Sequence, residues 1–310
     1  MLQNISEGIK SQIGNYVLNQ EVVTELALTA FFAGGHILLV GPTGLGKAKW
    51  ARAFAGALGL DYNSAQLTES TIPDRLYSTY TQDGENQPVS RPGALFSPVF
   101  HAKFYESNMD NTFPRFDNTQ EWAHMRILDA IDRNERATNE YGSESFSLPD
   151  PHFIIASLSD TRILPKPLVD RFMMKLYINY PGVAAEKQIL QAYHTNAPEP
   201  EPTPICTPET IAQAKQEVQA VMVDDAIFNY IVSIAETTRR ISAIQTGVSP
   251  RASMALLQAA KAYAVICGRD YVTTSDVKSL AIPVLRHRIT LRPDAVKEGV
   301  NADRIIESII

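Results

Sequence analysis

The spacing of apolar residues near the start of the chain predicts two helices, a buried strand and a third helix. Residues 4–32 carry apolar side chains at helical intervals, and this pattern breaks near Gly14 and Asn19. Residues 35–40, GHILLV, form a short apolar run that is typical of a buried parallel strand. Helical spacing returns over residues 48–58. A glycine-rich segment joins this strand to this helix.

The middle of the chain alternates between strand-like and helix-like segments. Residues 62–68 predict a second strand, and residues 94–104 form a further apolar segment. Residues 121–135 keep apolar side chains on one face of a helix. Residues 136–149 predict a short hairpin, and residues 152–157, HFIIAS, predict another buried strand. Alternation of this kind favours an α/β fold with a parallel sheet.

After Pro181 the pattern is helical only. Capping signals such as Thr207-Pro208 and Ser249-Pro250 introduce some of the helical segments, which are residues 208–222, 224–242, 250–267 and 273–286. Residues 197–204, APEPEPTP, are expected to be a stiff, extended and exposed connector, because proline excludes a helix. We therefore predict an α/β domain over residues 1–182 and an all-helical domain over residues 183–310.

The glycine-rich segment after the first strand matches a phosphate-binding loop at every position except the last. The motif G-x-x-x-x-G-K-[ST] cradles phosphates with backbone N–H groups, reaches them with its lysine and binds Mg²⁺ with its final hydroxyl. The matching residues are Gly41, Pro42, Thr43, Gly44, Leu45, Gly46, Lys47 and Ala48. A plain glycine turn without a ligand is the alternative. Strand, loop and helix follow in the required order, so we expect a bound nucleotide.

Composition restricts the partners and the compartment. The 310 residues carry a formal net charge of −6, which argues against a protein that grips nucleic acid through a basic surface. Cys206 and Cys267 are far apart and lack metal-ligand spacing, so two free thiols in a reducing compartment are expected. No secretory signal and no apolar run of bilayer length is visible. We therefore expect a cytoplasmic protein with no membrane span and no nucleic-acid partner.

Short motifs follow one another in a fixed order along the chain. They are Asn19-Gln20, Gln66-Leu67-Thr68, Pro92-Gly93-Ala94-Leu95-Phe96, Asp170-Arg171-Phe172, Ile178-Asn179-Tyr180-Pro181, Gly247-Val248-Ser249-Pro250-Arg251-Ala252, Gly268-Arg269-Asp270-Tyr271-Val272 and His287-Arg288. Each is weak alone, but with the phosphate loop their order and spacing resemble the MoxR family of AAA+ ATPases over nearly the whole chain. The resemblance implies an AAA+ core, with helices on a parallel sheet, followed by a small helical lid.

The resemblance also implies how a nucleotide would be held. Lys47 would contact the β- and γ-phosphates of ATP or ADP, with Mg²⁺ as the family's usual companion. Val17 and Leu18 would pack on the adenine, although apolar residues of this kind also serve as ordinary core.

Two arginines have implied roles at the nucleotide. Arg171 would be the arginine finger, which stabilises charge on the γ-phosphate held by a neighbouring subunit. An ion pair between Arg171 and Asp170 is the alternative. Arg251 would be sensor 2 and would reach from the lid to the nucleotide of its own chain. A finger that acts between subunits implies a ring, expected to be a homohexamer.

Three departures from the family pattern affect the metal and the attacking water. Ala48 replaces the magnesium-binding hydroxyl. The Walker-B pair Asp-Glu falls on Lys103-Phe104 in an ungapped register, or on Tyr105-Glu106 if the later Glu-x-Asn pattern is matched, and neither register contains the aspartate. The sensor-1 asparagine falls on Ser159. The candidate catalytic residues are therefore Arg171, Glu106 and Ser159, and the metal has no evident protein ligand.

Three classes of function follow. The chain is predicted to be a nucleotide-binding remodelling or assembly factor with weakened or lost hydrolysis, working with itself or with an active paralogue on a client protein that the sequence does not identify. The alternatives are a fully active MoxR-type ATPase ring and a small-molecule P-loop kinase. Residues 108–120, with Phe113, Pro114 and Phe116, form either a client-binding patch or an ordinary packed loop.

Overall fold

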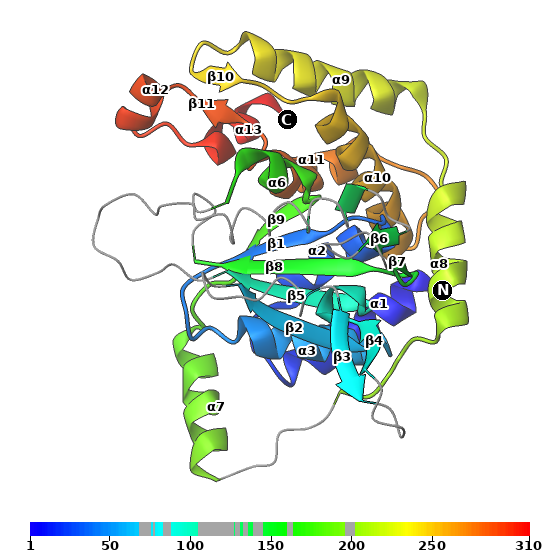
Figure 1. Cartoon of the computed structure of the whole chain (residues 1–310). Helices are drawn as coiled ribbons and strands as arrows, with labels where there is room; N and C mark the ends of the chain where they lie inside the picture. Colours follow the sequence, from blue (N-terminus) through cyan, green and yellow to red (C-terminus); the bar gives the residue numbers. More distant parts are fainter. Residues whose placement is uncertain are drawn as a thin grey trace.

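The computed structural model places a parallel sheet with covering helices beside a helical lid (Figure 1). It describes residues 1–67, 76, 78–82, 88–104, 127, 131–132, 136–138, 145–159, 164–195 and 202–310. Both the predicted α/β core and the helical second part are confirmed.

Five parallel strands form the central sheet. Their spatial order is β2 (Tyr62–Leu67), β5 (Val99–Phe104), β8 (Phe153–Leu158), β1 (Ile37–Val40) and β9 (Met174–Tyr177). Every residue of β1 and β8 is buried, as expected for central strands covered on both faces. Because β8 lies between β1 and β5, the segments that follow these three strands meet at one edge of the sheet.

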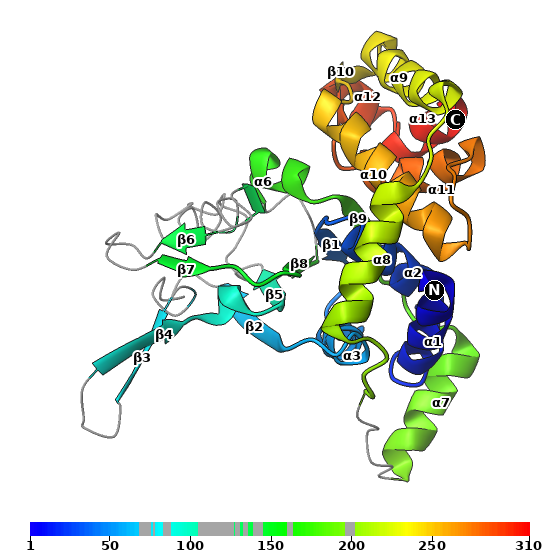
Figure 2. The same ribbon diagram turned by 90° about the vertical axis from the view of Figure 1, so that its right-hand side faces the viewer.

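Helices cover one face of the sheet, and two ribbons project on the other side (Figure 2). Helices α2 (Glu21–Phe32) and α3 (Lys47–Ala57) lie on the sheet, and α1 (Leu2–Gly14) packs on both of them. The antiparallel ribbons are β3 (Ser78–Gln82) with β4 (Pro88–Pro92), and β6 (Arg136–Thr138) with β7 (Ser145–Ser147). A short 3-10 helix, η1 (Ala94–Phe96), precedes β5. The hairpin predicted over residues 136–149 is confirmed by β6 and β7.

The second half of the chain is mainly helical. A short helix α6 (Lys166–Arg171) precedes β9, and α7 (Val183–His194) leaves the sheet and projects from the body (Figure 1). The later helices are α8 (Pro208–Ala220), α9 (Asp225–Arg240), α10 (Pro250–Ile266), α11 (Thr274–Leu285), α12 (Pro293–Lys297) and α13 (Ala302–Ile309). The helix-only prediction missed an antiparallel ribbon of β10 (Ile244–Thr246) and β11 (Thr290–Leu291), because strands of two or three residues leave no periodicity in a sequence.

Local capping explains where the lid helices begin. The Ser249 side chain accepts the N–H of Ala252 at the start of α10, and Pro250 follows it as a first-turn residue without a donor. Thr273 and Asp276 form a reciprocal capping box on α11. Arg269 binds both oxygens of Asp276 and so ties the preceding turn to this cap.

The lid and the core share one apolar interior. Helix α10 packs on α1 and α2, and α11 packs on β9. Buried residues of both parts, such as Ile9 and Leu256, belong to one continuous cluster. The boundary between residues 182 and 183 stays a prediction.

The described end of the proline-rich connector contacts α3. A Cβ built on Gly56 of α3 would lie 2.4 Å from Pro202, and one on Gly59 would lie 3.3 Å from Pro204. The N–H of Ile205 donates to the carbonyl oxygen of Ala57. The connector therefore lies against the end of α3, while Thr203 and Pro204 are exposed, as expected for this part.

Several predicted features lie outside the described residues. They are Glu106, the 108–120 segment with Phe113, Pro114 and Phe116, most of the helix predicted over residues 121–135, and connector residues 197–201. Among the residues that are described, no helix has both the length and the apolar character needed to cross a bilayer.

Candidate functional site

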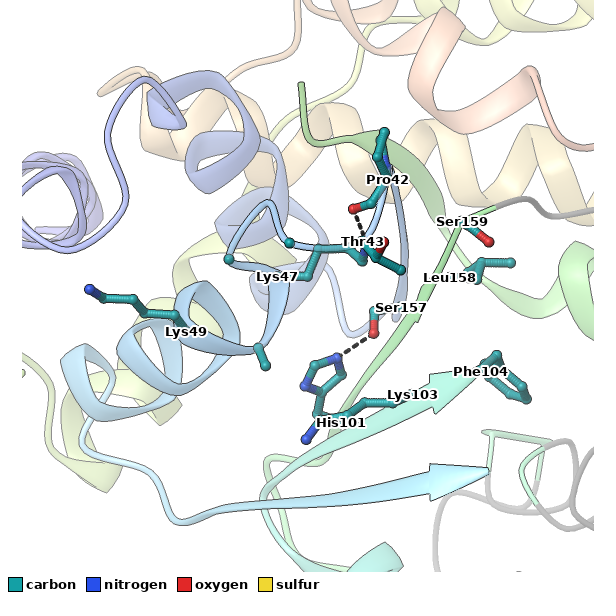
Figure 3. Close-up of a pocket in the computed structure, with 13 residues that line it drawn as sticks. Pro42, Thr43, Lys47, Lys49, His101, Lys103, Phe104, Ser157, Leu158 and Ser159 are labelled. Carbon is teal, nitrogen blue, oxygen red and sulfur yellow. Dashed lines mark hydrogen bonds between the residues drawn. The ribbon is translucent and has the colours of Figure 1, made fainter. Parts of the chain in front are cut away.

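A cavity of about 800 Å³ opens at the carboxyl edge of the sheet, where the segments after β1, β5 and β8 meet (Figure 3). Its described lining comes from the phosphate loop, the start of α3 and the ends of β5 and β8. These residues are Pro42, Thr43, Gly44, Gly46, Lys47, Ala48, Lys49, His101, Lys103, Phe104, Ser157, Leu158 and Ser159. Ligands of open α/β sheets bind outside the carboxyl ends of the strands, and the volume suits a small organic ligand.

Glycines give the loop its shape. Gly44 and Gly46 have φ angles of +86° and +79°, in the left-handed region that side chains disfavour. At Gly41 the reason is space, since a Cβ there would lie 2.4 Å from the carbonyl oxygen of Ile178. The N–H of Gly41 donates to the carbonyl oxygen of Leu158 at 3.1 Å, which ties the start of the loop to β8.

Lys47 begins α3 and turns back over the loop. Its Nζ donates to the carbonyl oxygens of Gly41 at 2.5 Å and Pro42 at 2.7 Å. Burial lowers the pKa of the Lys47 ammonium below its ordinary value. The first turn of α3 has no side-chain cap, so its N–H groups and the positive end of the helix dipole favour an anion at the same place. The loop and Lys47 together fit a polyphosphate.

The turn between α1 and α2 lies beside the loop. A Cβ on Gly46 would meet Cγ1 of Val17 at 3.9 Å, and Val17 is half-buried. Asn19 has a φ of 59°, which asparagine tolerates better than most residues. This position is consistent with the adenine contact predicted for Val17. Leu18 is also half-buried, and its adenine contact stays a prediction.

Strand β5 reaches the cavity with Lys103 and Phe104. Lys103 pairs with Ser157 of β8, and Val40, just before the loop, pairs with Leu158. Lys103 and Phe104 are therefore level with the start of the loop, where the ungapped register placed the metal-binding pair. Tyr105 and Glu106 lie outside the described residues, so the catalytic role of Glu106 stays a prediction.

Ser159 lines the cavity directly after β8, at the sensor-1 position (Figure 3). A hydroxyl there has a shorter reach than the amide of asparagine. Its action on an attacking water stays a prediction.

His101 forms the floor of the cavity and was not identified from the sequence. Burial, with smaller contributions from the charges of Lys103 and Lys47, lowers the pKa of His101 to about 3, so the ring is neutral. Nδ1 shares a hydrogen bond of 2.8 Å with the hydroxyl of Tyr62, and Nε2 shares one of 2.7 Å with that of Ser157. The alternation of side chains along a strand could have identified His101, because it puts residues 101 and 103 on the same face of β5.

A smaller cavity of about 160 Å³ lies at the opposite edge of the sheet. Gly35 and His36 line it and precede β1, whereas the phosphate loop follows β1. The four residues of β1 separate the two places by about 13 Å. Arg171, Arg251 and Arg288 also line this second cavity. The sequence-predicted arginines are therefore together, but away from the phosphate loop of their own chain.

Asp132 joins two of these arginines. Nε and Nη2 of Arg171 donate to its two oxygens at 2.6 and 2.8 Å, and Nη1 of Arg251 lies 3.6 Å from Oδ1. The hydrogen bond from Arg171 is the main cause that lowers the pKa of Asp132. Asp132 was missed because no motif surrounds it. The alternative pairing of Arg171 with Asp170 is corrected, since the carboxylate bound to Arg171 is that of Asp132.

The role expected for Arg251 also needs correction. A sensor 2 that reaches the nucleotide of its own chain would lie at the carboxyl edge of the sheet. Helix α10 instead begins at the amino-terminal edge, so Arg251 shares a cavity with Arg171.

The turn after α11 in the lid binds the backbone of the Asp170-Arg171-Phe172 segment. Arg288 is 4% exposed, and its Nη2 donates to the carbonyl oxygens of Asp170 at 3.2 Å and Phe172 at 2.9 Å. His287 Nε2 donates to the same Phe172 oxygen at 2.9 Å. Burial lowers the pKa of Arg288 to about 10. The backbone on both sides of Arg171 is therefore fixed by the lid.

Known proteins resemble both parts of the chain. Residues 236–309 match the AAA lid domain. The protein YeaC of Bacillus subtilis is 32% identical over 308 residues, which cover 96% of this chain and 91% of YeaC. The chaperone MoxR1 of Mycobacterium tuberculosis is 25% identical, with 96% and 79% covered, and the protein MoxR of Paracoccus denitrificans is 26% identical, with 92% and 88% covered. This chain belongs to the MoxR family of AAA+ ATPases.

A solved structure resembles this MoxR-family chain over nearly its whole length. A crystal structure from Cytophaga hutchinsonii, described as an ATPase, has a TM-score of 0.87 and 25% identity, and the match covers 99% of this chain and 94% of that one. The AAA+ core and lid implied by the resemblance are thus confirmed.

The cavity suits a nucleotide's phosphates better than it suits Mg²⁺. Mg²⁺ requires oxygen ligands in a near-octahedral arrangement. Ala48 offers a methyl group where the motif has a hydroxyl, and Lys103, the second-last residue of β5, lines the same cavity. The described lining of the cavity includes no aspartate or glutamate. In the described part of the chain, no group of three or more His, Cys, Asp or Glu side chains is placed to hold a metal ion.

Proposed function

We propose that this MoxR-family protein binds ATP or ADP and acts as a chaperone-like remodelling or assembly factor whose ATP hydrolysis is weakened or lost. One observation carries the proposal: Ala48 and Lys103 line the cavity, and its described lining holds no aspartate or glutamate. Phosphoryl transfer depends mainly on positioned charge around the γ-phosphate, so this loss is expected to reduce turnover by orders of magnitude. The name of the relative Chaperone MoxR1 supports the chaperone-like role.

Self-assembly is part of the proposal. Arg171 and Arg251 lie together at the edge of the sheet opposite the phosphate loop. Both arginines would then serve a nucleotide bound by the next subunit, as in a ring. We propose a homohexamer, or a mixed ring with an active paralogue, that acts on a client protein.

The compartment is the remaining part of the proposal. Cys206 and Cys267 are unpaired, which supports a reducing cytoplasm.

Two assays on the same purified, assembled sample test the proposal. Nucleotide binding is measured by calorimetry, and phosphate release is measured with ATP and Mg²⁺. The expected result is saturable binding with little or no phosphate release. Lys47→Ala is expected to abolish binding, while Lys297→Ala, which removes an exposed charge from α12, is expected to leave it unchanged. Magnesium-dependent turnover at rates normal for an ATPase would overturn the proposal.

A fully active ring is the second candidate. Arg171 and Arg251 are both retained and lie together, which favours it. Turnover that rises with protein concentration would select this candidate, because active sites between subunits require assembly. The P-loop kinase alternative is set aside, because the chain belongs to the MoxR family.

A further inference from the structure

The nucleotide cavity carries an excess of positive charge. Its described lining includes Lys47, Lys49 and Lys103 and no acidic side chain. Lys47, Lys103 and His101 line the same cavity, and both ammonium groups contribute to the lowered pKa of the His101 ring. Figure 3 shows Lys47, His101, Lys103 and Ser157 gathered from three elements, whereas the Lys49 side chain extends away from them.

Lys103 is placed by the sheet and not by a flexible loop. It is the second-last residue of β5 and pairs with Ser157 on β8, the strand next to β1. Its side chain is half-buried and shares a face of β5 with His101. No carboxylate of the described residues forms an ion pair with it. A lysine held in this position can form a charge-assisted hydrogen bond with an anionic ligand in the cavity.

A divalent cation at the same place would meet unfavourable surroundings. It would lie beside the Lys103 ammonium and would find a methyl group at Ala48. His101 is unsuited as a ligand, because both of its ring nitrogens are engaged by Tyr62 and Ser157. The described site therefore supplies its own cation where an ordinary ATPase binds a metal.

We infer that Lys103 takes over the charge of Mg²⁺ and that the site binds adenine nucleotides as metal-free polyphosphates. The inference rests on the proposed function, since it specifies which form of the nucleotide is bound. Lys47 contacts the phosphates from the loop and Lys103 contacts them from the strand. Mg²⁺ complexation lowers the charge of the nucleotide and so weakens its attraction to the two lysines.

The test is calorimetric titration of the full-length protein with ATP and with ADP, in EDTA and in excess Mg²⁺. The wild-type protein is expected to bind in EDTA at least as tightly as in Mg²⁺. Lys103→Ala and Lys103→Met are expected to weaken binding in EDTA by roughly 10- to 100-fold, the loss typical of a charge-assisted hydrogen bond. Lys278→Ala removes an exposed charge from α11, away from the cavity lining, and is expected to change the affinity by less than about threefold. Thermal melts verify that each variant is folded.

A converse variant tests the same idea by restoring the motif. Ala48→Ser combined with Lys103→Asp supplies the two oxygen ligands and is expected to make nucleotide binding require Mg²⁺. Wild-type binding that requires Mg²⁺, or affinity that is unchanged in a folded Lys103→Met protein, would overturn the inference and leave the proposed function standing. Absence of binding in both buffers by the folded wild-type protein would instead overturn the proposed function itself.

Discussion

At the first position of the phosphate loop, Gly41 leaves no room for any side chain. A Cβ there would lie 2.4 Å from the backbone oxygen of Ile178, a residue whose own N–H donates a hydrogen bond to the carbonyl oxygen of Val40. We expect Gly41→Ala to cost about 1–3 kcal/mol of unfolding free energy, as overpacking does, and to weaken nucleotide binding. Urea unfolding and calorimetry measure the two effects.

Gly14→Ala is the matched control for that substitution. Nothing lies within 4 Å of a Cβ on Gly14 at the end of α1. The same change is expected to be neutral or to stabilise by up to about 1 kcal/mol, because alanine favours the helix. Equal losses in both variants would show that the Ile178 contact is not the cause.

Single residues of the site were predictable only where the signal is local. Gly41 and Lys47 belong to one continuous motif, so their spacing alone identified them. His101 and Asp132 were not identified, because their partners are 56 and 39 residues away in the chain. Which strand lies beside β5, and in which register, is a property of the folded sheet.

At the scale of elements, the contact of the turn after α11 with the Arg171 segment connects the lid to the proposed ring interface. Arg288→Met would remove the buried donor of the Asp170 oxygen and one of the two donors of the Phe172 oxygen, which keeps His287. We expect a loss of about 1–3 kcal/mol in unfolding free energy. We also expect a smaller assembled mass with nucleotide present, because Arg171 is less well held. Arg304→Met, which changes an exposed residue of α13, serves as the control and is expected to alter neither value. Unchanged stability and mass in Arg288→Met would refute this coupling.

Helix α7 exposes an apolar face that a neighbouring copy of the chain is proposed to cover. Val183, Ile189, Leu190 and Tyr193 are 89%, 49%, 64% and 82% exposed and lie on one side of the helix. β9 ends with Tyr177 beside Val40, so α7 leaves the sheet at the phosphate-loop edge. In the proposed ring, we expect the subunit that brings Arg171 to this edge to lie against α7.

Leu190→Glu is therefore expected to shift the protein towards smaller assemblies in light scattering coupled to gel filtration, because the new charge would be buried at the interface. Gln191→Glu adds the same charge to the same helix on its other side and is expected to leave the mass unchanged. An assembled mass that Leu190→Glu does not reduce would exclude α7 from the interface.

The order of elements was well predicted from the sequence, but their packing was not. Long amphipathic segments such as α10 carry a clear period, so the predicted 250–267 and the observed Pro250–Ile266 nearly coincide. The place of α10 depends on which apolar face meets α1 and α2, and periodicity gives no information about that choice. Arg251 was consequently expected at the wrong edge of the sheet.

At the scale of the whole molecule, buried histidines make stability depend on pH. Burial lowers the pKa of His36 and of His101 to about 3, that of His152 to about 4, and that of His287 well below 6.5. Below pH 6.5 the unfolded chain therefore binds protons that the folded chain excludes. The contribution of these neutral histidines to the unfolding free energy is fully present above pH 6.5. It is lost as the pH falls towards 4, by up to about 1.4 kcal/mol per pH unit for each histidine.

His36→Asn isolates one of these groups, because an asparagine oxygen can still accept the N–H of Ile154 that His36 Nδ1 accepts. Its unfolding free energy, measured in urea between pH 5 and pH 6, is expected to fall with pH by about 1.4 kcal/mol per unit less steeply than in the wild-type protein. The variant has no imidazole at residue 36 to bind a proton on unfolding. The slope therefore changes even if the substitution also lowers the overall stability. His194→Asn alters an exposed histidine of α7 and is expected to keep the wild-type slope. Identical slopes in both variants would mean that His36 is not held neutral by burial.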